Sequence, residues 1–427
     1  MNFEWVSFTK LLSAIVDNRG RTCPVGDIGI PLIATNCINS SNLYPNYDTT
    51  RFVSEETYRS WFRGHPKPGD ILFVCKGSPG RTNWVPEPVD FCIAQDMVAV
   101  RANAGKVYPK YLFAALRSTV VLSQIDNMHV GTMIPHFKKG DFDKLNIPVP
   151  SRDAQEQIGD FYFNLSEKIN LLRETNATLE SIAQALFKSW FVDFDPVRAK
   201  MEGREPEGMD ADTAALFPDD FEESELGLVP RGWRYSTIVE EFVLTMGQSP
   251  PGHTYNSSGN GKPFYQGRTD FGFRFPIQRV FCTAPTRLAE AGDTLVSVRA
   301  PVGDVNMALE QCCLGRGVAG VRHPRDYCSF VFYVIQGLRI KFDMHNSEGT
   351  VFGSINKKDF SFLPVIKPLE DILMEFENIV SPLDRRIIEN EKQIRTLTVL
   401  RDSLLPRLIS GQLRLPEAEA AMEAVLT

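Results

Sequence analysis

Several stretches of the chain combine glycine and proline with side chains that form hydrogen bonds or carry positive charge. Gly and Pro shape tight loops and let another backbone approach closely. In such loops Arg and Gln can form paired hydrogen bonds with base edges, whereas Lys and Thr suit phosphate groups. The candidate DNA-contacting residues are Lys76, Ser78, Arg81, Thr132, His136, Lys138, Lys139, Ser249, Tyr255, Gln266, Arg268, Arg299 and Thr350. Each loop alone could be an ordinary surface loop, but recurrence at equivalent places, such as Lys76 and Arg299, favours binding.

Catalytic motifs are missing from the sequence. It contains neither a G-x-x-x-x-G-K-[S/T] phosphate loop nor an H-E-x-x-H zinc helix. Residues 315–320 fit G-x-G-x-x-G, but a dinucleotide site needs a helix to begin there, and His323-Pro324 follows almost at once. A cluster of glycines in a strand or turn is therefore the favoured interpretation. We assign no catalytic residue, no metal ligand and no cofactor to this chain.

The remaining composition indicates a globular protein of a reducing compartment. The eight Cys form no C-x-x-C pair, and the six His are dispersed. No apolar run reaches the roughly 18 residues that cross a bilayer, and the N-terminus lacks the charged and apolar regions of a signal peptide. We expect a cytoplasmic protein without a membrane partner.

The positions of these loops follow an internal repeat. Gly69-Asp70 resembles Gly292-Asp293, and Asp141-Phe142 matches Asp359-Phe360 at an offset of 218 residues. In each half a short Pro-containing strand then leads into a long helical segment. Short apolar runs broken by Gly and Pro predict strands in residues 1–150 and 228–367, with helices beginning near residues 111 and 329. Two copies of one mixed α and β unit indicate one task performed twice.

The two helical segments carry a seven-residue repeat. Mostly apolar residues recur from Ile158 to Leu186 and from Phe376 to Leu404, with a second set four residues after each. Five heptads with such a seam predict a coiled-coil pair, each helix spanning roughly 48 Å at 1.5 Å per residue. Pro406 should end or kink the second helix.

Two asparagines interrupt the seam in its middle layer. An antiparallel pairing places Asn176 opposite Asn390 and Leu172 opposite Ile394. A parallel pairing would set each Asn against an apolar partner and leave a buried amide unsatisfied, at a cost of about 1–3 kcal/mol. We therefore predict antiparallel helices whose register is fixed by Asn176 and Asn390. The alternative is that both asparagines turn to solvent.

The formal net charge of −7 is unevenly distributed. Residues 201–226 contain ten acidic residues and one basic residue, and the tail from residue 416 adds three acidic residues. The rest of the chain has 45 basic and 40 acidic residues. The acidity therefore belongs to a linker and a tail, which we expect to be extended and poorly packed. Charge does not exclude DNA as a partner.

The sequence resembles the specificity subunit of type I restriction–modification systems over nearly its whole length. The motifs that carry the resemblance are LFKSWFVDFDPVR at 186–198 with MEG at 201–203, PRGW at 230–233, SPP at 249–251, PFYQG at 263–267 and LLPRLISG at 404–411. The first half lacks the Ser-Pro-Pro motif, although recognition domains of this family vary widely.

The resemblance implies an α+β protein with a pseudo-twofold internal repeat, in which two globular α/β target recognition domains are separated by two long antiparallel coiled-coil helices. Each domain would read one half of a bipartite, asymmetric site in double-stranded DNA with a nonspecific spacer. The helices would dock two modification (methyltransferase) subunits, which hold S-adenosylmethionine. Restriction (motor-nuclease) subunits that use ATP and magnesium would then join. The chain itself would be non-catalytic.

This interpretation divides the chain as follows: recognition domain 1–152, spacer helix 153–195, acidic linker 196–227, recognition domain 228–367, spacer helix 368–412 and acidic tail 413–427. Two other classes of function stay open. A stand-alone enzyme, such as a fused methyltransferase, would bind S-adenosylmethionine by itself. An adaptor that has lost sequence reading would interact with DNA without sequence preference or salt dependence.

Overall fold

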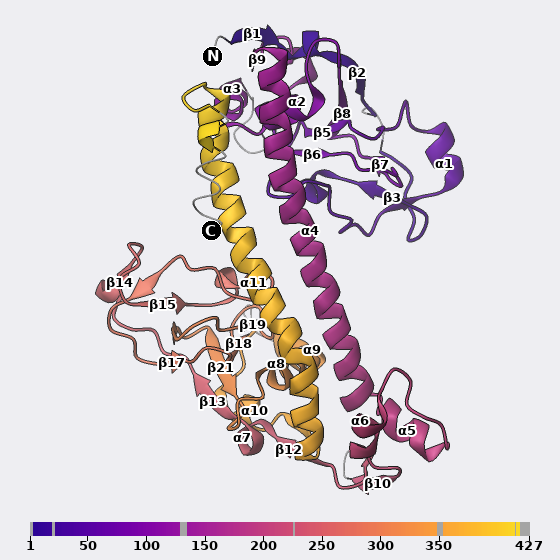
Figure 1. Cartoon of the computed structure of the whole chain (residues 1–427), viewed down its shortest axis with the longest axis vertical. Coiled ribbons are helices and arrows are strands. Elements are labelled where there is room, and N and C mark those ends of the chain that lie inside the picture. The colour runs from indigo at the N-terminus through magenta and orange to yellow at the C-terminus, as the bar shows by residue number, and fades with distance from the viewer. Residues whose placement is uncertain are drawn as a thin grey trace. The chain divides into compact units, whose positions relative to one another are not determined.

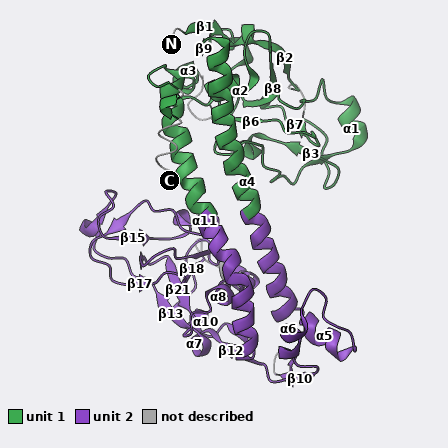
Figure 2. Cartoon of the chain, in the orientation of Figure 1, with its two compact units in different colours: residues 1–175, 390–427 green, residues 176–389 purple. Residues whose placement is uncertain are grey.

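The computed structural model describes residues 3–18, 22–128, 135–224, 227–347, 353–414 and 416–418. The chain forms two compact units (Figures 1 and 2). Unit 1 comprises residues 1–175 and 390–427, and unit 2 comprises residues 176–389. Each unit contains one globular part and one portion of each of two 40-residue helices, α4 (Arg152–Phe191) and α11 (Glu370–Ile409).

Unit 1 is built from short strands because Gly and Pro interrupt its apolar runs. An antiparallel sheet has the order β2-β8-β5-β6, a second sheet has the order β4-β3-β7 with β3 and β7 parallel, and β1 pairs with β9. The strands are β1 (Glu4–Ser7), β2 (Leu12–Val16), β3 (Ile30–Ile33), β4 (Phe52–Val53), β5 (Ile71–Val74), β6 (Thr82–Trp84), β7 (Cys92–Ile93), β8 (Met97–Ala102) and β9 (Asn146–Val149). The helices of the globular part are α1 (Glu55–Ser60), α2 (Pro109–Leu116) and α3 (Thr119–Met128).

Unit 2 repeats this plan. The sheet β13-β21-β18-β19 corresponds strand by strand to β2-β8-β5-β6, β15 and β20 form the parallel pair, and β12 pairs with β22. The strands are β10 (Phe221–Ser224), β11 (Gly227–Pro230), β12 (Arg234–Thr237), β13 (Val243–Met246), β14 (Tyr255–Asn256), β15 (Lys262–Tyr265), β16 (Phe281–Cys282), β17 (Leu288–Ala289), β18 (Thr294–Ser297), β19 (Val305–Met307), β20 (Cys312–Leu314), β21 (Val318–Arg322) and β22 (Pro364–Lys367). The helices are α5 (Asp195–Met201), α6 (Ala211–Leu216), α7 (Ile238–Glu241), α8 (Cys328–Gly337), α9 (Arg339–Ser347) and α10 (Lys357–Ser361). The predicted internal repeat and α+β class are confirmed.

An ion pair between a buried aspartate and a half-buried arginine occurs in both units and shows why the Gly-Asp motif recurs. Asp70 accepts from Nε and Nη2 of Arg101 at 2.7 and 2.8 Å, and Asp293 accepts from the same atoms of Arg322 at 2.6 and 2.9 Å. In both units the Asp also accepts a backbone N–H from three residues earlier, which closes the turn before the strand. The preceding glycines have φ of 83° and 88°, a left-handed conformation that favours Gly. The motif therefore fixes the entry to β5 and β18.

The long helices match the predicted seam. Each runs for 40 residues at the offset of 218 that the heptads show, and the second residues of the heptads from Tyr162 to Trp190 and from Val380 to Leu408 are all at most 7% exposed. In unit 1 Leu172 and Ile394 share a buried cluster, and Ile158 packs in the same core as Leu408. In unit 2 Phe376 contacts the rings of Phe187, Trp190 and Phe191. The helices are therefore antiparallel within each unit.

Asn176 and Asn390 are each 1% exposed, so the alternative that they turn to solvent is wrong. Their pairing with each other stays a prediction.

The prediction that Pro406 ends the second helix is wrong, and so is the prediction of an extended linker. Helix α11 continues past Pro406 to Ile409, because Leu404, Leu405 and Leu408 are buried in the unit 1 core and offset the hydrogen bond that proline removes. A kink at Pro406 stays a prediction. The acidic segment after residue 195 is not an extended linker. It forms α5, α6 and the β10–β11 hairpin, and Phe217 is 2% exposed with its ring 5.0 Å from that of Trp190.

Candidate nucleic-acid interface

Three segments of unit 1 meet where the sheet ends. The backbone N–H of Cys75, after β5, donates to the carbonyl of Asp96 in the β7–β8 turn at 3.0 Å. Gly77 donates to Pro135 at 2.9 Å, and Phe137 donates back to Cys75 at 2.9 Å, so Lys76 and His136 form a bridge. We name these segments, residues 75–81, 94–96 and 135–139, the first loop cluster. Its backbone is held by hydrogen bonds within the unit.

Several of the candidate DNA-contacting residues lie in the first loop cluster. A cavity of about 280 Å³ is lined by Lys76, Gln95, Asp96 and His136. Lys76, Arg81 and Lys138 are exposed, and Ser78 and His136 are half-buried. Lys139 differs because its ammonium pairs with Asp17 at 3.3 Å. Thr132 lies outside the described residues, as does Thr350 in the second half.

Unit 2 contains the same arrangement. Val298, after β18, donates to Gly317 in the β20–β21 turn at 2.9 Å, which corresponds to the Cys75–Asp96 bond. Ala300 donates to Gly353 at 2.9 Å, Ile355 donates to Val298 at 3.1 Å, and Arg299 forms a bridge with Ser354. The expected equivalence of Lys76 and Arg299 is therefore confirmed in the backbone. We name residues 298–300, 315–317 and 353–355 the second loop cluster.

The turn at residues 315–317 also contacts two further loops, which therefore lie beside the second loop cluster. The Arg316 N–H donates to Ser249 Oγ at 3.4 Å, and Gly315 donates to the Tyr265 carbonyl at 2.8 Å. A Cβ on Gly317 would lie 2.2 Å from the carbonyl oxygen of Gln266, so only glycine permits this approach. Ser249, Gln266 and Arg299 therefore lie around one turn. The interpretation of G-x-G-x-x-G as a glycine cluster in a strand or turn is confirmed, because residues 315–317 form the turn and residues 318–320 belong to β21.

Tyr255 and Arg268 already have partners within unit 2. The Tyr255 hydroxyl donates to the Pro250 carbonyl at 2.7 Å, and its ring lies 4.7 Å from that of Phe264, which fixes the Ser-Pro-Pro loop. Arg268 pairs with Asp304 at 2.6 Å, although its side chain is 61% exposed. Both residues shape the loops around the turn.

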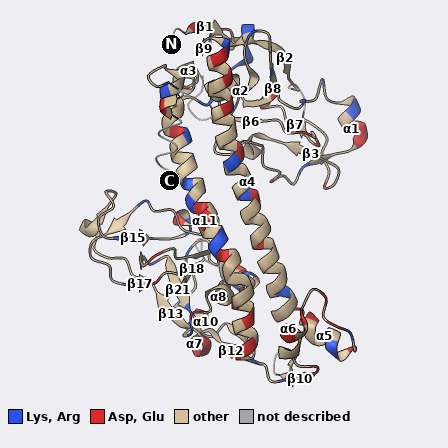
Figure 3. Cartoon of the chain, viewed as in Figure 1, with Lys and Arg blue, Asp and Glu red and all other residues tan. Residues whose placement is uncertain are grey.

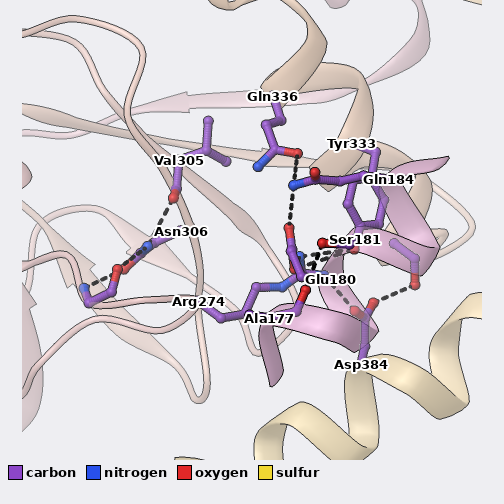
Figure 4. Close-up of polar contacts among 12 residues, drawn as sticks. Ala177, Glu180, Ser181, Gln184, Arg274, Val305, Asn306, Tyr333, Gln336 and Asp384 are labelled. Atoms are coloured by element: carbon purple, nitrogen blue, oxygen red, sulfur yellow. Dashed lines mark hydrogen bonds and ion pairs between the residues drawn. The ribbon is translucent and has the colours of Figure 1, made fainter. Parts of the chain in front are cut away.

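A buried arginine fastens the globular part of unit 2 to the helices (Figure 4). Arg274 is 1% exposed and donates to Glu180 of α4 at 2.6 Å and to Asp384 of α11 at 2.5 Å. It also donates to the Tyr333 hydroxyl at 3.2 Å. Burial alone would lower the pKa of Arg274, but the attraction of Asp384, Tyr333 and Glu180 raises it above its ordinary value. Burial raises the pKa of Asp384, and the charge of Arg274 opposes that rise.

In unit 1 the contact between helix and globular part is made differently. Arg173 of α4 donates to the Ser41 carbonyl at 3.0 Å and to Asn42 Oδ1 at 2.9 Å.

Figure 3 shows Lys and Arg interspersed with Asp and Glu along α4 and α11. In the described part of the chain, no helix is long and apolar enough to cross a membrane.

Sequence reasoning missed Gln95 and Arg316. Both side chains are exposed at the turns that the loop clusters surround. A signal in the flanking segments could have found them, because Cys92-Ile93 and Val100-Arg101 match Cys313-Leu314 and Val321-Arg322 at an offset of 221 residues. The parallel strand pairs β3–β7 and β15–β20 place both residues at the same point of each unit.

A family model, two relatives in sequence and one solved structure all point to type I restriction–modification specificity proteins. A family model described as type I restriction modification DNA specificity domain matches residues 24–181. The putative type I restriction enzyme MjaX specificity subunit of Methanocaldococcus jannaschii is 27% identical over 365 residues, covering 81% of this chain and 79% of that protein. The type I restriction enzyme HindI specificity subunit of Haemophilus influenzae is 28% identical over 408 residues, covering 81% of this chain and 87% of that protein. The crystal structure of a type I restriction–modification S subunit from M. genitalium has the same fold, with a TM-score of 0.59, 15% identity and 96% coverage of both chains.

Proposed function

Because the chain belongs to the family of type I restriction–modification specificity subunits, we propose that it reads a bipartite, asymmetric DNA site, one half-site by each globular part. The observation that carries this proposal is the repetition of one hydrogen-bonded loop cluster in both units with different side chains. Lys76 and His136 in unit 1 correspond to Arg299 and Ser354 in unit 2. Two similar scaffolds with different hydrogen-bonding groups suit two different half-sites.

We further propose that the helices dock two modification subunits and that restriction subunits then join. Exposed apolar side chains on α4 and α11 support this step. Leu171, Ile182, Met374 and Val399 are between 49% and 67% exposed, so each helix offers apolar side chains that a partner subunit would cover. S-adenosylmethionine, ATP and magnesium would then belong to the partner subunits, and this chain would direct their chemistry without catalysing it.

The test is expression of this chain with a modification subunit of the same system, followed by single-molecule sequencing of the methylated DNA. We expect methylated adenine in one asymmetric motif with two specified parts and an unspecified spacer. Methylation without sequence preference, or a continuous motif, would contradict the proposal. Purified chain without a partner serves as the control. S-adenosylmethionine binding or methylation by that chain alone would favour a stand-alone enzyme.

A further inference from the structure

The two loop clusters present side chains at three corresponding positions. Lys76 and Arg299 follow strands β5 and β18, and His136 and Ser354 are their bridge partners. The third position lies in the turn after the parallel strand. Gln95 and Arg316 each precede the residue whose carbonyl accepts from the loop after β5 or β18. Each unit therefore displays a triad, Lys76–Gln95–His136 in unit 1 and Arg299–Arg316–Ser354 in unit 2.

The backbone of each triad is fixed while its side chains face outward. Lys76, Gln95, Arg299, Arg316 and Ser354 are all exposed, and His136 is half-buried. The hydrogen bonds that position the three segments use backbone atoms, so they do not depend on which side chain is present. A rigid scaffold with variable outward side chains is what a site for reading different half-sites requires.

We propose that Gln95 and Arg316 are base-reading residues, each acting within the triad of its own recognition domain. The inference rests on the proposed function and deepens it. Gln forms paired hydrogen bonds with N6 and N7 of adenine, and Arg forms them with O6 and N7 of guanine in the major groove. Arg316 therefore reads a guanine in one half-site, and Gln95 reads an adenine in the other.

The unit 2 geometry shows how Arg316 is presented. Gly315 and Gly317 on either side pack against the backbone of Tyr265 and Gln266, and the Arg316 N–H donates to Ser249 Oγ. The turn is thus held on both sides while the guanidinium stays exposed. In unit 1 Gln95 lines the cavity shared with Lys76 and His136, which places the amide beside two other hydrogen-bonding groups.

The test exchanges the two side chains. The full chain carrying Arg316→Gln is expressed with its modification subunit, and its methylation motif is determined by single-molecule sequencing. We expect preference at one position of one half-site to shift from guanine to adenine, with the original discrimination falling by about 10- to 100-fold and the other half-site unchanged. Gln95→Arg should make the reverse shift, in the other half-site. Arg234→Ala, which removes an exposed arginine on β12, is the matched control and should leave the motif intact.

The outcomes separate this inference from the proposed function. An unchanged motif in Arg316→Gln and Gln95→Arg, or changes by both in the same half-site, would overturn the inference while the wild-type motif keeps the proposed function. A wild-type complex without any motif would overturn the proposed function itself. If either exchange abolishes methylation, Arg316→Ala and Gln95→Ala replace it, and relaxed preference at the same single base pair is the expected result. Unrelaxed preference in these variants would overturn the inference.

Discussion

Lys138 and Lys139 are neighbours in the sequence but differ in their partners. Lys138 is exposed, whereas the Lys139 ammonium pairs with Asp17. We predict that Lys138→Ala weakens binding of the complex to all DNA sequences about equally and lowers the salt dependence by about 0.9 in log–log slope if one phosphate contact is lost. Lys139→Ala should have a smaller effect, because its charge is already partly neutralised.

The measurement is fluorescence anisotropy of the complex with the modification subunit, using specific and unrelated duplexes over a series of salt concentrations. Lys138→Ala and Lys139→Ala serve as each other's comparison, since both remove one positive charge from adjacent positions. A change in base preference without a change in salt slope would assign Lys138 to base reading instead of phosphate binding.

At the same scale, some candidate residues could be found from sequence and others could not. Lys76 and Arg299 stand out because Gly, Pro and a basic residue occur together locally. Gln95 and Arg316 lack this combination, and only the repeat of Cys92-Ile93 and Val100-Arg101 at residues 313–314 and 321–322 relates them in the sequence. Their place beside Lys76 and Arg299 follows from the pairing of β3 with β7 and of β15 with β20. Conversely, Tyr255 and Arg268 have the right chemistry for binding, but their internal partners are visible only in three dimensions.

At the scale of elements, Arg274 connects the globular part of unit 2 to both long helices through buried ion pairs. We predict that Arg274→Met destabilises the chain by about 3–5 kcal/mol, because Glu180 and Asp384 would lose their shared counter-charge while 12% and 8% exposed. Arg386→Met, which breaks an exposed pair with Glu389, is the matched control and should cost less than about 1 kcal/mol. Thermal unfolding of the full chain measures both.

The pH dependence of Arg274→Met gives a sharper check. Burial raises the pKa of Asp384, and loss of Arg274 removes the charge that opposes this rise. A carboxyl group whose pKa is raised by folding stabilises the folded state below its unfolded pKa, and this contribution is lost as pH increases through the folded pKa. The destabilisation by Arg274→Met should therefore be larger at pH 8 than at pH 5. An equal loss at both pH values would mean that Asp384 does not depend on Arg274 for its charge.

Elements differed in how well sequence predicted them. The long helices were predictable because a heptad seam is a local signal, and residues 370–409 repeat the spacing of residues 152–191. The acidic segment after α4 was not, because its charge suggested an extended chain. Its order depends on a few aromatic residues, such as Phe217 against Trp190, that meet only after folding. The composition of a segment does not reveal a single aromatic contact of this kind.

For the whole molecule, the placement of charge matters more than its total. Ten acidic residues lie in residues 201–226, where α5, α6 and β10 are formed, and the basic candidates are divided between two loop clusters. Each loop cluster therefore presents only a few positive charges. Because phosphate contacts supply much of the affinity for DNA, tight binding should require additional contacts from the modification subunits.

The repeat makes the two globular parts separable at defined ends. Glu4 of β1 pairs with Val149 of β9, and Arg234 of β12 pairs with Lys367 of β22, so each globular part begins and ends on one antiparallel strand pair. We predict that replacing residues 1–150 by the corresponding part of another family member changes one half-site only, because unit 2 keeps its own loop cluster. The imported part must retain the apolar face that packs on Ile158, Tyr162 and Leu408, or the core of unit 1 is lost. Replacement of residues 234–367 is the reciprocal control, and single-molecule sequencing of methylated DNA gives both motifs. If one replacement altered both half-sites, the two loop clusters would not read DNA independently.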